Sequence, residues 1–125
     1  MPATPLVSVL LPTRNGVAFL PHALDSLCAQ QAGEALEVVA VDDGSTDGTV
    51  ALLERYRARL PIRILSSHAS NWVENTNVAL EQASGDYVSL LHQDDGWLAG
   101  RHARLAAAAR SHPDVPVLLT DAVFV

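Results

Sequence analysis

The chain has 125 residues, with 14 acidic and 8 basic side chains and a formal net charge of −6. All 8 basic residues are arginine, which excludes a P-loop lysine, a Schiff-base lysine and a polybasic surface for nucleic acid or membranes. The apolar fraction of 49% and the charged fraction of 18% exclude a disordered chain and predict one globular domain.

The first strand and helix are expected within the first 31 residues. Val7–Leu11 is a short β-type apolar run that ends at Pro12, and it predicts a strand. Val17–Gln31 then predicts a helix, because its apolar residues recur at helical spacing. The face they form consists of Leu20, Leu24, Leu27 and Cys28.

A second strand and helix follow the same pattern. Leu36–Val41 is an apolar run that predicts a buried strand, and Asp42-Asp43-Gly44-Ser45 comes directly after it. The next helix is expected to begin at Ser45 or Thr46, since both side chains are good N-caps. Its apolar side consists of Val50, Leu53, Tyr56 and Leu60.

The second half of the chain continues the alternation. We expect strands at Ile62–Leu65 and Tyr87–Leu91, separated by a helix at Val73–Ala83. The alanine-rich segment Arg101–Ser111 predicts a further helix, and Val115–Thr120 predicts a fifth strand. No repeat, low-complexity tract or linker marks a second domain, so residues 1–125 are treated as one unit.

This alternation predicts an α/β, Rossmann-like fold with a mostly parallel sheet and flanking helices. In such sheets a ligand binds at the carboxyl ends of the strands, where the strand order reverses. The polar segments Pro12–Gly16, Asp42-Asp43, Ser66–Asn71 and Asp94-Asp95 all fall at those ends. With the strand order 3-2-1-4, the two acid pairs would flank the loop after the first strand.

Asp94 and Asp95 form the more informative acid pair. Adjacent carboxylates repel each other unless a cation or hydrogen-bond donors relieve them, and oxygen ligands suit Mg²⁺ or Mn²⁺. The alternative is an ordinary loop in which one Asp caps the next helix. His92 is a further candidate for the metal shell, although a hydrogen-bonded histidine at a strand end is an equally good interpretation.

The acid pair after the second strand has several interpretations. Asp43 and Glu54 fall at the first and last positions of an EF-hand calcium spacing, but an EF-hand needs a helix before the loop, and the sequence predicts a strand there. Ser45 and Asp47 are expected to serve the N-terminus of the helix. The pair Asp42-Asp43 then remains free to accept hydrogen bonds from a nucleobase N–H or ribose hydroxyls.

Other polar and aromatic residues carry weaker signals. Thr13-Arg14-Asn15-Gly16 contains an ordinary Asn-Gly turn signal, and N-capping explains one of the asparagines Asn71, Asn75 and Asn77. Trp72 and Trp97 are expected in the core, with stacking on a ligand ring as the alternative.

The single cysteine, Cys28, excludes a disulfide framework and fits a reducing compartment. No apolar run approaches the length of about 18 residues that a transmembrane helix needs. We therefore expect a cytoplasmic protein, with a peripheral membrane association open for the full-length chain.

The motifs of this chain, taken in order, resemble those of the inverting family-2 glycosyltransferases, which have a GT-A fold. Residues 7–15, VSVLLPTRN, resemble the first strand and "PTYN" loop of that family, and residues 39–47, VAVDDGSTD, resemble its "VVDDGSTD". Asn77 with residues 83–87, ASGDY, resembles the "N…A.G.Y" stretch. Residues 91–95, LHQDD, stand in the place of "LDxDD".

The resemblance implies a three-layer GT-A fold that transfers a sugar from a UDP-, GDP- or dTDP-sugar to an unknown acceptor, as in cell-wall or polysaccharide biosynthesis. It implies a Mn²⁺ or Mg²⁺ ion held by Asp94 and Asp95, with His92 as a third candidate. The residues that it assigns to the donor are Pro12, Thr13, Arg14, Asn15, Asp42, Asp43, Asn71, Asn77, Gln93 and Asp94.

Two departures from the family pattern limit what the resemblance implies. His92 stands where the family's metal motif starts with Asp, and the acceptor-binding half with its catalytic base is expected beyond Val125. The chain is therefore interpreted as the donor-binding half, inactive alone. A non-catalytic nucleotide- or metal-binding α/β module is the alternative, whereas a receiver domain is rejected because its acid pair follows the first strand and it needs a lysine.

Overall fold

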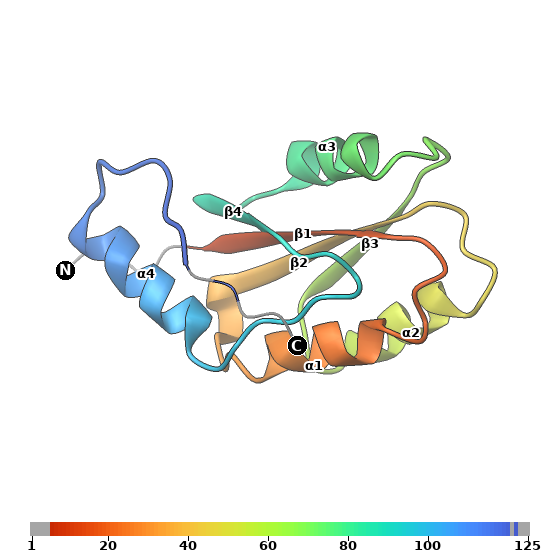
Figure 1. Ribbon diagram of the computed structural model, residues 1–125, viewed down its shortest axis with the longest axis horizontal. Helices are drawn as coiled ribbons and strands as arrows, with labels where there is room; N and C mark the ends of the chain where they lie inside the picture. The colour runs from red at the N-terminus through yellow and green to blue at the C-terminus, as the bar shows by residue number, and fades with distance from the viewer. Residues whose placement is uncertain (1–5, 121, 123–125) are drawn as a thin grey trace.

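The computed structural model describes residues 6–120 and 122 (Figure 1). Four strands alternate with four α-helices, and a single 3₁₀ turn, η1, at Gly33–Ala35 precedes the second strand. The strands are β1 Val7–Thr13, β2 Leu36–Asp42, β3 Ile62–Ser66 and β4 Tyr87–Leu90. The helices are α1 Leu20–Cys28, α2 Thr49–Tyr56, α3 Trp72–Gln82 and α4 Arg101–Ser111.

The four strands form one parallel sheet in the order β3-β2-β1-β4, which confirms the predicted order. Helices α1 and α2 cover one face and α3 covers the other (Figure 1). The strand order reverses between β1 and β4, so the carboxyl end of β1 lies at the switch point where parallel sheets bind ligands.

The strands are mostly apolar, and the central strands β1 and β2 are largely buried because helices cover both faces of the sheet there. Successive side chains of a strand point to opposite faces. Val9 and Leu11 of β1 therefore join the core beneath α1 and α2, whereas Leu10 packs with Ala79 of α3 on the other face. Thr13, Asp42 and Asp43, at the carboxyl ends of β1 and β2, are buried polar residues next to this core.

The stretch Ala83–Tyr87 has a structural role at the amino ends of the strands. The N–H of Gly85 donates to the Ser8 hydroxyl at 2.8 Å, and the N–H of Ser84 donates to the Glu37 carboxylate at 2.7 Å. A Cβ on Gly85 would lie 2.6 Å from Ser8 Oγ and 2.8 Å from the carbonyl oxygen of Leu6. Only glycine fits this approach, which explains that part of the motif without any ligand.

The predicted fifth strand, Val115–Thr120, is wrong. Within the described residues this segment pairs with no strand, and Val117 and Leu119 are 65% and 87% exposed. Pro116 lies inside the segment and lacks the N–H that a ladder requires at that position. The apolar residues of this run were therefore a poor guide to pairing.

Two helix starts also differ from prediction. The first helix begins at Leu20 and not at Val17, because residues 17–19 form a turn in which the carbonyl of Gly16 accepts from the N–H groups of Phe19 and Leu20. The second begins at Thr49, with Gly48 at the N-cap in the left-handed region (φ 90°). Neither Ser45 nor Thr46 caps it.

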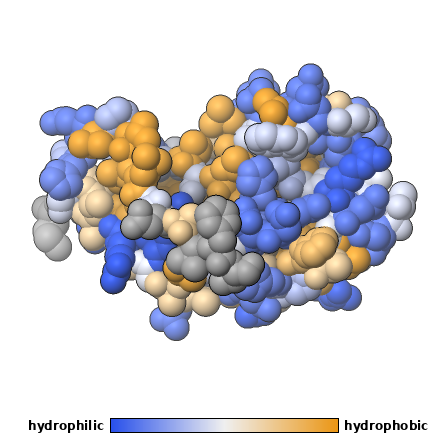
Figure 2. Space-filling model, in the orientation of Figure 1, coloured by the Kyte–Doolittle hydropathy of each residue, from blue (hydrophilic) through white to orange (hydrophobic). Residues whose placement is uncertain are grey.

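The surface is uneven in character (Figure 2). Hydrophilic side chains predominate at the end of the molecule that carries the carboxyl ends of the strands, and hydrophobic ones gather around β4 and α4. None of the helices in the described part of the chain is long and apolar enough to cross a membrane.

Candidate functional site

A pocket of about 280 Å³ lies at the carboxyl ends of β1, β2 and β4, beside the start of α3. It draws on four separate segments of the chain, three of them strand ends or loops and the fourth the first turn of α3 with the residues before it. Its lining residues are Pro12, Thr13, Arg14, Asp43, Ser70, Asn71, Trp72, Asn75, His92, Gln93 and Asp94. The pocket is therefore at the location where the sequence places its polar motifs.

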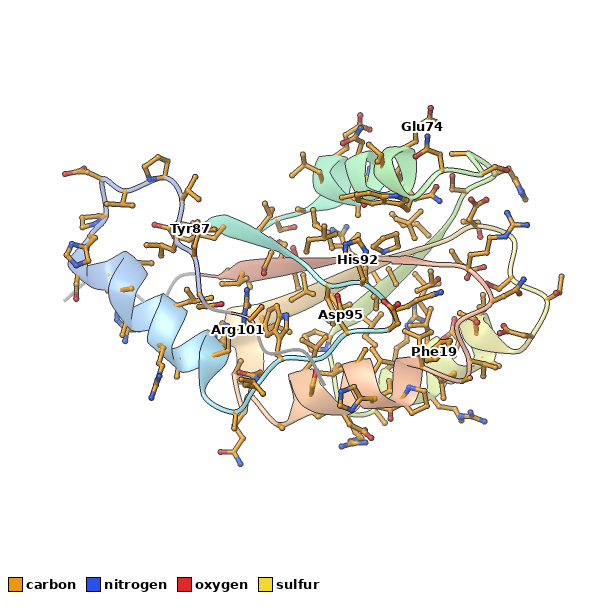
Figure 3. The ribbon with its side chains drawn as sticks, viewed as in Figure 1. Phe19, Glu74, Tyr87, His92, Asp95 and Arg101 are labelled. Carbon is orange, nitrogen blue, oxygen red and sulfur yellow. The ribbon has the colours of Figure 1, made fainter. Side chains whose placement is uncertain are left out.

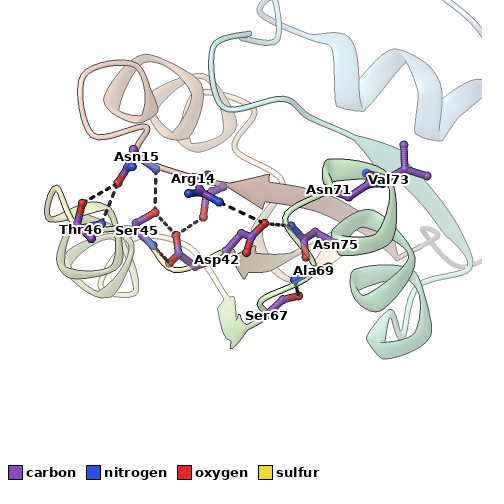
Figure 4. A network of polar contacts seen from close by, with 12 residues as sticks. Arg14, Asn15, Asp42, Ser45, Thr46, Ser67, Ala69, Asn71, Val73 and Asn75 are labelled. Carbon is purple, nitrogen blue, oxygen red and sulfur yellow. Dashed lines mark hydrogen bonds and ion pairs between the residues drawn. The ribbon is translucent and has the colours of Figure 1, made fainter.

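Asp42 ends β2 and is only 4% exposed. Its carboxylate accepts hydrogen bonds from the Thr13 hydroxyl at 2.7 Å, the Ser45 N–H at 2.9 Å and the Ser45 hydroxyl at 2.6 Å (Figure 4). These bonds satisfy both oxygens and join the ends of β1 and β2. The family resemblance assigns Asp42 to the donor. In the structure Asp42 is not among the residues that line the pocket; it lies behind them and holds Thr13 and the β2–α2 loop in place.

Ser45 has a different role from the predicted one. Its hydroxyl binds Asp42 and also accepts from the N–H of Asn15 at 2.8 Å. The side-chain oxygen of Asn15 in turn accepts from the N–H of Thr46 at 2.8 Å. The side chain of Asn15 is thus engaged by the β2–α2 loop, and Asn15 is absent from the residues that line the pocket.

Asp47 completes this loop and serves the start of α2, as predicted. Its carboxylate accepts from the N–H and hydroxyl of Thr49 and from the N–H of Val17. The hydrogen bond from the Thr49 hydroxyl is the main reason that the pKa of Asp47 lies below its ordinary value. The loop is therefore built from charge-assisted hydrogen bonds.

Asp43 is the acid of the first pair that lines the pocket. It is 4% exposed, and its carboxylate accepts from the side-chain amide of Asn75 at 3.1 Å (Figure 4). The guanidinium of Arg14 lies 4.0 Å away and is largely exposed. Asp43 is held by one neutral donor and one distant cation, which leaves its carboxylate with capacity to accept further hydrogen bonds.

The family resemblance assigns Asn77, and not Asn75, to the donor-binding site. Asn75 is 2% exposed and lines the pocket, and its side-chain oxygen has no partner among the described residues. Asn77 lies on the exposed side of α3 and is outside the lining. Helical spacing separates them, because residues two positions apart point in different directions.

Gln93 joins the loop after β4 to the loop after β1. Its side-chain oxygen accepts from the N–H of Arg14 and its side-chain nitrogen donates to the carbonyl of Arg14, both at 2.9 Å. A Cβ on Gly16 would lie 2.3 Å from the Gln93 oxygen, so a glycine at position 16 makes room for this clamp. Gln93 lines the pocket, but its side-chain amide is already hydrogen-bonded to the backbone of Arg14.

The second acid pair is exposed. Asp94 lines the pocket and makes no hydrogen bond or ion pair with residues 6–120 and 122, and Asp95 uses only its N–H, which donates to the carbonyl of His92. Figure 3 shows His92 and Asp95 on the loop that follows β4. Nothing in the described chain relieves the charge of Asp94.

The described residues contain no group of three or more His, Cys, Asp or Glu side chains that could hold a metal ion by themselves. Mg²⁺ and Mn²⁺ are commonly held by one or two carboxylates together with water and substrate phosphates. The oxygen donors of Asp94 fit an ion of this kind. They do not form a preformed metal cage.

The start of α3 forms one wall of the pocket. The Asn71 side chain caps the helix by accepting from the N–H groups of Val73 and Glu74, which confirms N-capping for this asparagine. Trp72 follows, and its indole meets the His92 ring edge-on with centroids 5.2 Å apart. The expectation that Trp72 lies in the core is wrong, since it is 56% exposed, whereas Trp97 does pack against the core.

Comparison with known proteins agrees with this arrangement. The family model described as "Glycosyl transferase family 2" matches residues 8–124. A poly(ribitol-phosphate) beta-N-acetylglucosaminyltransferase from Staphylococcus aureus, TarS, is 37% identical over 91 residues, which are 70% of this chain and 16% of TarS.

Two solved structures share the fold. TarS 1-349 from S. aureus in complex with UDP-GlcNAc superposes with a TM-score of 0.80 and 32% identity, over 86% of this chain and 32% of that one. The mannosyltransferase PcManGT from Pyrobaculum calidifontis, in complex with GDP-Man and Mn²⁺, superposes with a TM-score of 0.76 and 30% identity, over 90% of this chain and 33% of that one.

The chain spans about a third of each solved chain and 16% of TarS. The expected GT-A fold is confirmed by these superpositions. Since the family model covers nearly all of its residues, the chain belongs to glycosyl transferase family 2.

Proposed function

We propose that the protein transfers a sugar from a nucleotide-diphospho-sugar to an acceptor, and that these residues form the donor-binding part. The observation that carries the proposal is that two different acids line one pocket at the switch point of the sheet. Asp43 is buried and bound by its neighbours, whereas Asp94 is exposed and has no partner among the described residues. The first suits uncharged hydrogen-bond donors, and the second suits a cation.

Asp43 is the proposed acceptor for the nucleoside. A nucleobase N–H or the ribose hydroxyls supply the donors that its carboxylate lacks, and Thr13 and Arg14 line the same part of the pocket. TarS is solved with UDP-GlcNAc and PcManGT with GDP-Man, which supports the nucleotide-sugar class. We extend the proposed donors to UDP-, GDP- and dTDP-sugars.

Asp94 is the proposed ligand of a Mn²⁺ or Mg²⁺ ion that accompanies the diphosphate, with Asp95 beside it and His92 as a third candidate. Arg14 is the one arginine that lines the pocket, against the two acids Asp43 and Asp94, and the chain has no lysine. A diphosphate therefore needs a further cation. When bound, such an ion stabilises the negative charge of the leaving nucleoside diphosphate.

The acceptor site and the general base are proposed to lie outside these residues. The chain covers about a third of the length of each of the two solved relatives. Among the described residues that line the pocket, only Asp43, Asp94 and His92 have the chemistry of a base. We therefore expect donor binding without transfer by this chain alone. We propose cell-wall or polysaccharide biosynthesis as the setting; the name of TarS, a poly(ribitol-phosphate) beta-N-acetylglucosaminyltransferase, supports a polymeric acceptor.

Isothermal titration calorimetry with UDP, GDP and dTDP, with and without Mn²⁺ or Mg²⁺, tests the proposal. We expect binding that requires the metal and that Asp94→Ala weakens by about tenfold to a hundredfold. Asp114→Ala removes an exposed acid outside the pocket and is the matched control. A folded sample that binds none of the nucleotides, or binding indifferent to Asp94→Ala, contradicts the proposal.

A donor-hydrolysis assay separates the enzyme from a non-catalytic binding module. Release of sugar from the bound donor above the uncatalysed rate would show that these residues already contain a base. Binding with no release in this chain, and transfer by a longer protein that contains it, is the expected pair of results.

A further inference from the structure

The indole of Trp72 combines exposure with firm anchoring. It is 56% exposed, and it lines the pocket as the first residue of α3. Single exposed apolar residues are common on protein surfaces and need no explanation by themselves. What distinguishes Trp72 is the number of contacts that hold it in place.

Three contacts restrict the position of Trp72. The Asn71 cap fixes the first turn of the helix, and the Thr76 hydroxyl donates to the carbonyl of Trp72 at 2.7 Å. The ring itself meets His92 in a T-shaped arrangement, with an interplanar angle of 73°. The first two contacts fix the backbone of Trp72 and the third restrains its ring, so part of the ordering that a ligand would require is already present.

The helix places Trp72 beside the acid proposed for the nucleoside. Residues three positions apart lie on the same side of a helix, so Trp72 and Asn75 are neighbours at the pocket. Asn75 donates to the Asp43 carboxylate. Asp43 and Trp72 line the same pocket of about 280 Å³, so a ligand that fills the pocket with its polar edge on Asp43 can also present a face to the indole.

We infer that Trp72 stacks on the nucleobase of the donor, an inference that rests on the proposed function. A base has a polar edge for Asp43 and an apolar face for the indole, whereas a diphosphate has no such face. Stacking is tolerant of the base, because every nucleobase has a π-face. Trp72 thus contributes affinity for the base, and the choice among bases depends on the polar contacts.

Calorimetry with Mn²⁺ and three probes tests the inference: UDP, UDP-GlcNAc and inorganic pyrophosphate, with GDP and GDP-Man replacing the uridine pair if the protein prefers guanosine. Trp72→Ala is expected to weaken UDP and UDP-GlcNAc by the same factor of about ten and to leave pyrophosphate unchanged. Trp72→Phe keeps a ring and should stay within about threefold. Val73→Ala, an exposed apolar neighbour outside the lining, is the control.

Fluorescence gives a second readout that does not depend on truncating the residue. The chain has two tryptophans, so Trp97→Phe leaves Trp72 as the single emitter. UDP should quench its emission, and pyrophosphate should not. Absence of quenching under saturating UDP overturns the inference.

The outcomes separate this inference from the function it rests on. If wild-type protein binds no nucleotide, the proposed function fails. If wild-type protein binds UDP and Trp72→Ala binds it equally well, only the stacking fails. Loss of affinity for UDP-GlcNAc without loss for UDP would assign the ring to the sugar and would also overturn it.

Discussion

Two Asp-Asp pairs follow two strands of one sheet, and their surroundings are opposite. Asp42 and Asp43 are each 4% exposed and accept hydrogen bonds from Thr13, Ser45 and Asn75. Asp94 and Asp95 are exposed, and within the described chain their carboxylates have no donor. The first pair is part of the folded framework, although the carboxylate of Asp43 also faces the pocket and can accept from a ligand, and the second pair has no protein partner of its own in the described chain.

The difference shows how one residue type performs two tasks. A buried carboxylate needs donors whether or not a ligand is present, so the protein supplies them and gains a rigid pocket wall. An exposed carboxylate is solvated and costs little to leave unpaired, so it can wait for a cation. We expect substitutions at the first pair to change stability and those at the second to change binding.

The largest effect is expected for Asp42→Ala. It removes the acceptor for the Thr13 hydroxyl and for two groups of Ser45, which leaves buried donors unpaired. We expect the free energy of unfolding to fall by about 3 kcal/mol and Tm to fall by about 10 °C. Urea titration and calorimetric scanning measure both.

Asp94→Ala is the matched control for that comparison. Because Asp94 is exposed and unpaired within the described residues, the free energy of unfolding should change by less than about 0.5 kcal/mol. Equal destabilisation by the two substitutions would show that the two acid pairs do not differ as described.

A smaller effect is expected for Asn75→Asp. It replaces the buried amide donor to Asp43 with a carboxyl, so two carboxylates face each other at pH 7. We expect a loss of about 2 kcal/mol. Repulsion raises the pKa of the carboxyl introduced at position 75 above its value in the unfolded chain, so the loss is full at neutral pH and shrinks as the pH falls and that carboxyl takes up a proton.

Urea titrations at several pH values measure this effect. Asn77→Asp, on the exposed side of the same helix, should stay within about 0.5 kcal/mol at every pH. If Asn77→Asp proved the more damaging of the two, the structural assignment of Asn75 to the pocket would be wrong.

The smallest effect is expected for Gln93→Met, because it removes only the side-chain amide that joins the loop after β4 to the loop after β1. Two hydrogen bonds to the backbone of Arg14 are lost, while the volume of the side chain is kept. We expect a loss of about 1 kcal/mol. Gln82→Met, at an exposed position on α3, is the control in the same urea titration, and no difference between them would mean that the clamp contributes nothing to stability.

Much of the fold could be predicted from local sequence patterns. The runs at β1 and β2 are apolar at all positions but Ser8 and Glu37, which favours strands covered on both faces, and the helices that follow them show apolar spacing of three and four. Val115–Thr120 shows the limit of this reasoning. Its residues have the same composition as a strand, but Pro116 and the absence of a partner leave it unpaired in the described chain.

The site was harder to predict residue by residue. Motif spacing placed Asp43, Thr13, Arg14 and Asp94 at the pocket, and the structure does bring them together. Motif spacing could not distinguish Asn75 from Asn77, since only the direction in which the helix packs decides which of them is buried. One signal favoured Asn75: it lies four residues after Asn71 and three after Trp72, which puts all three on one side of the helix.

The sequence by itself determined the order of strands and helices, the family and the end of the sheet that carries the polar groups, because these follow from periodicity and from motif order. Only the tertiary structure decided which polar groups are already used. The side chains of Asp42, Asn15 and Gln93 bind partners between 29 and 79 residues away in the sequence. Such partners are chosen by packing in space, which local patterns do not contain.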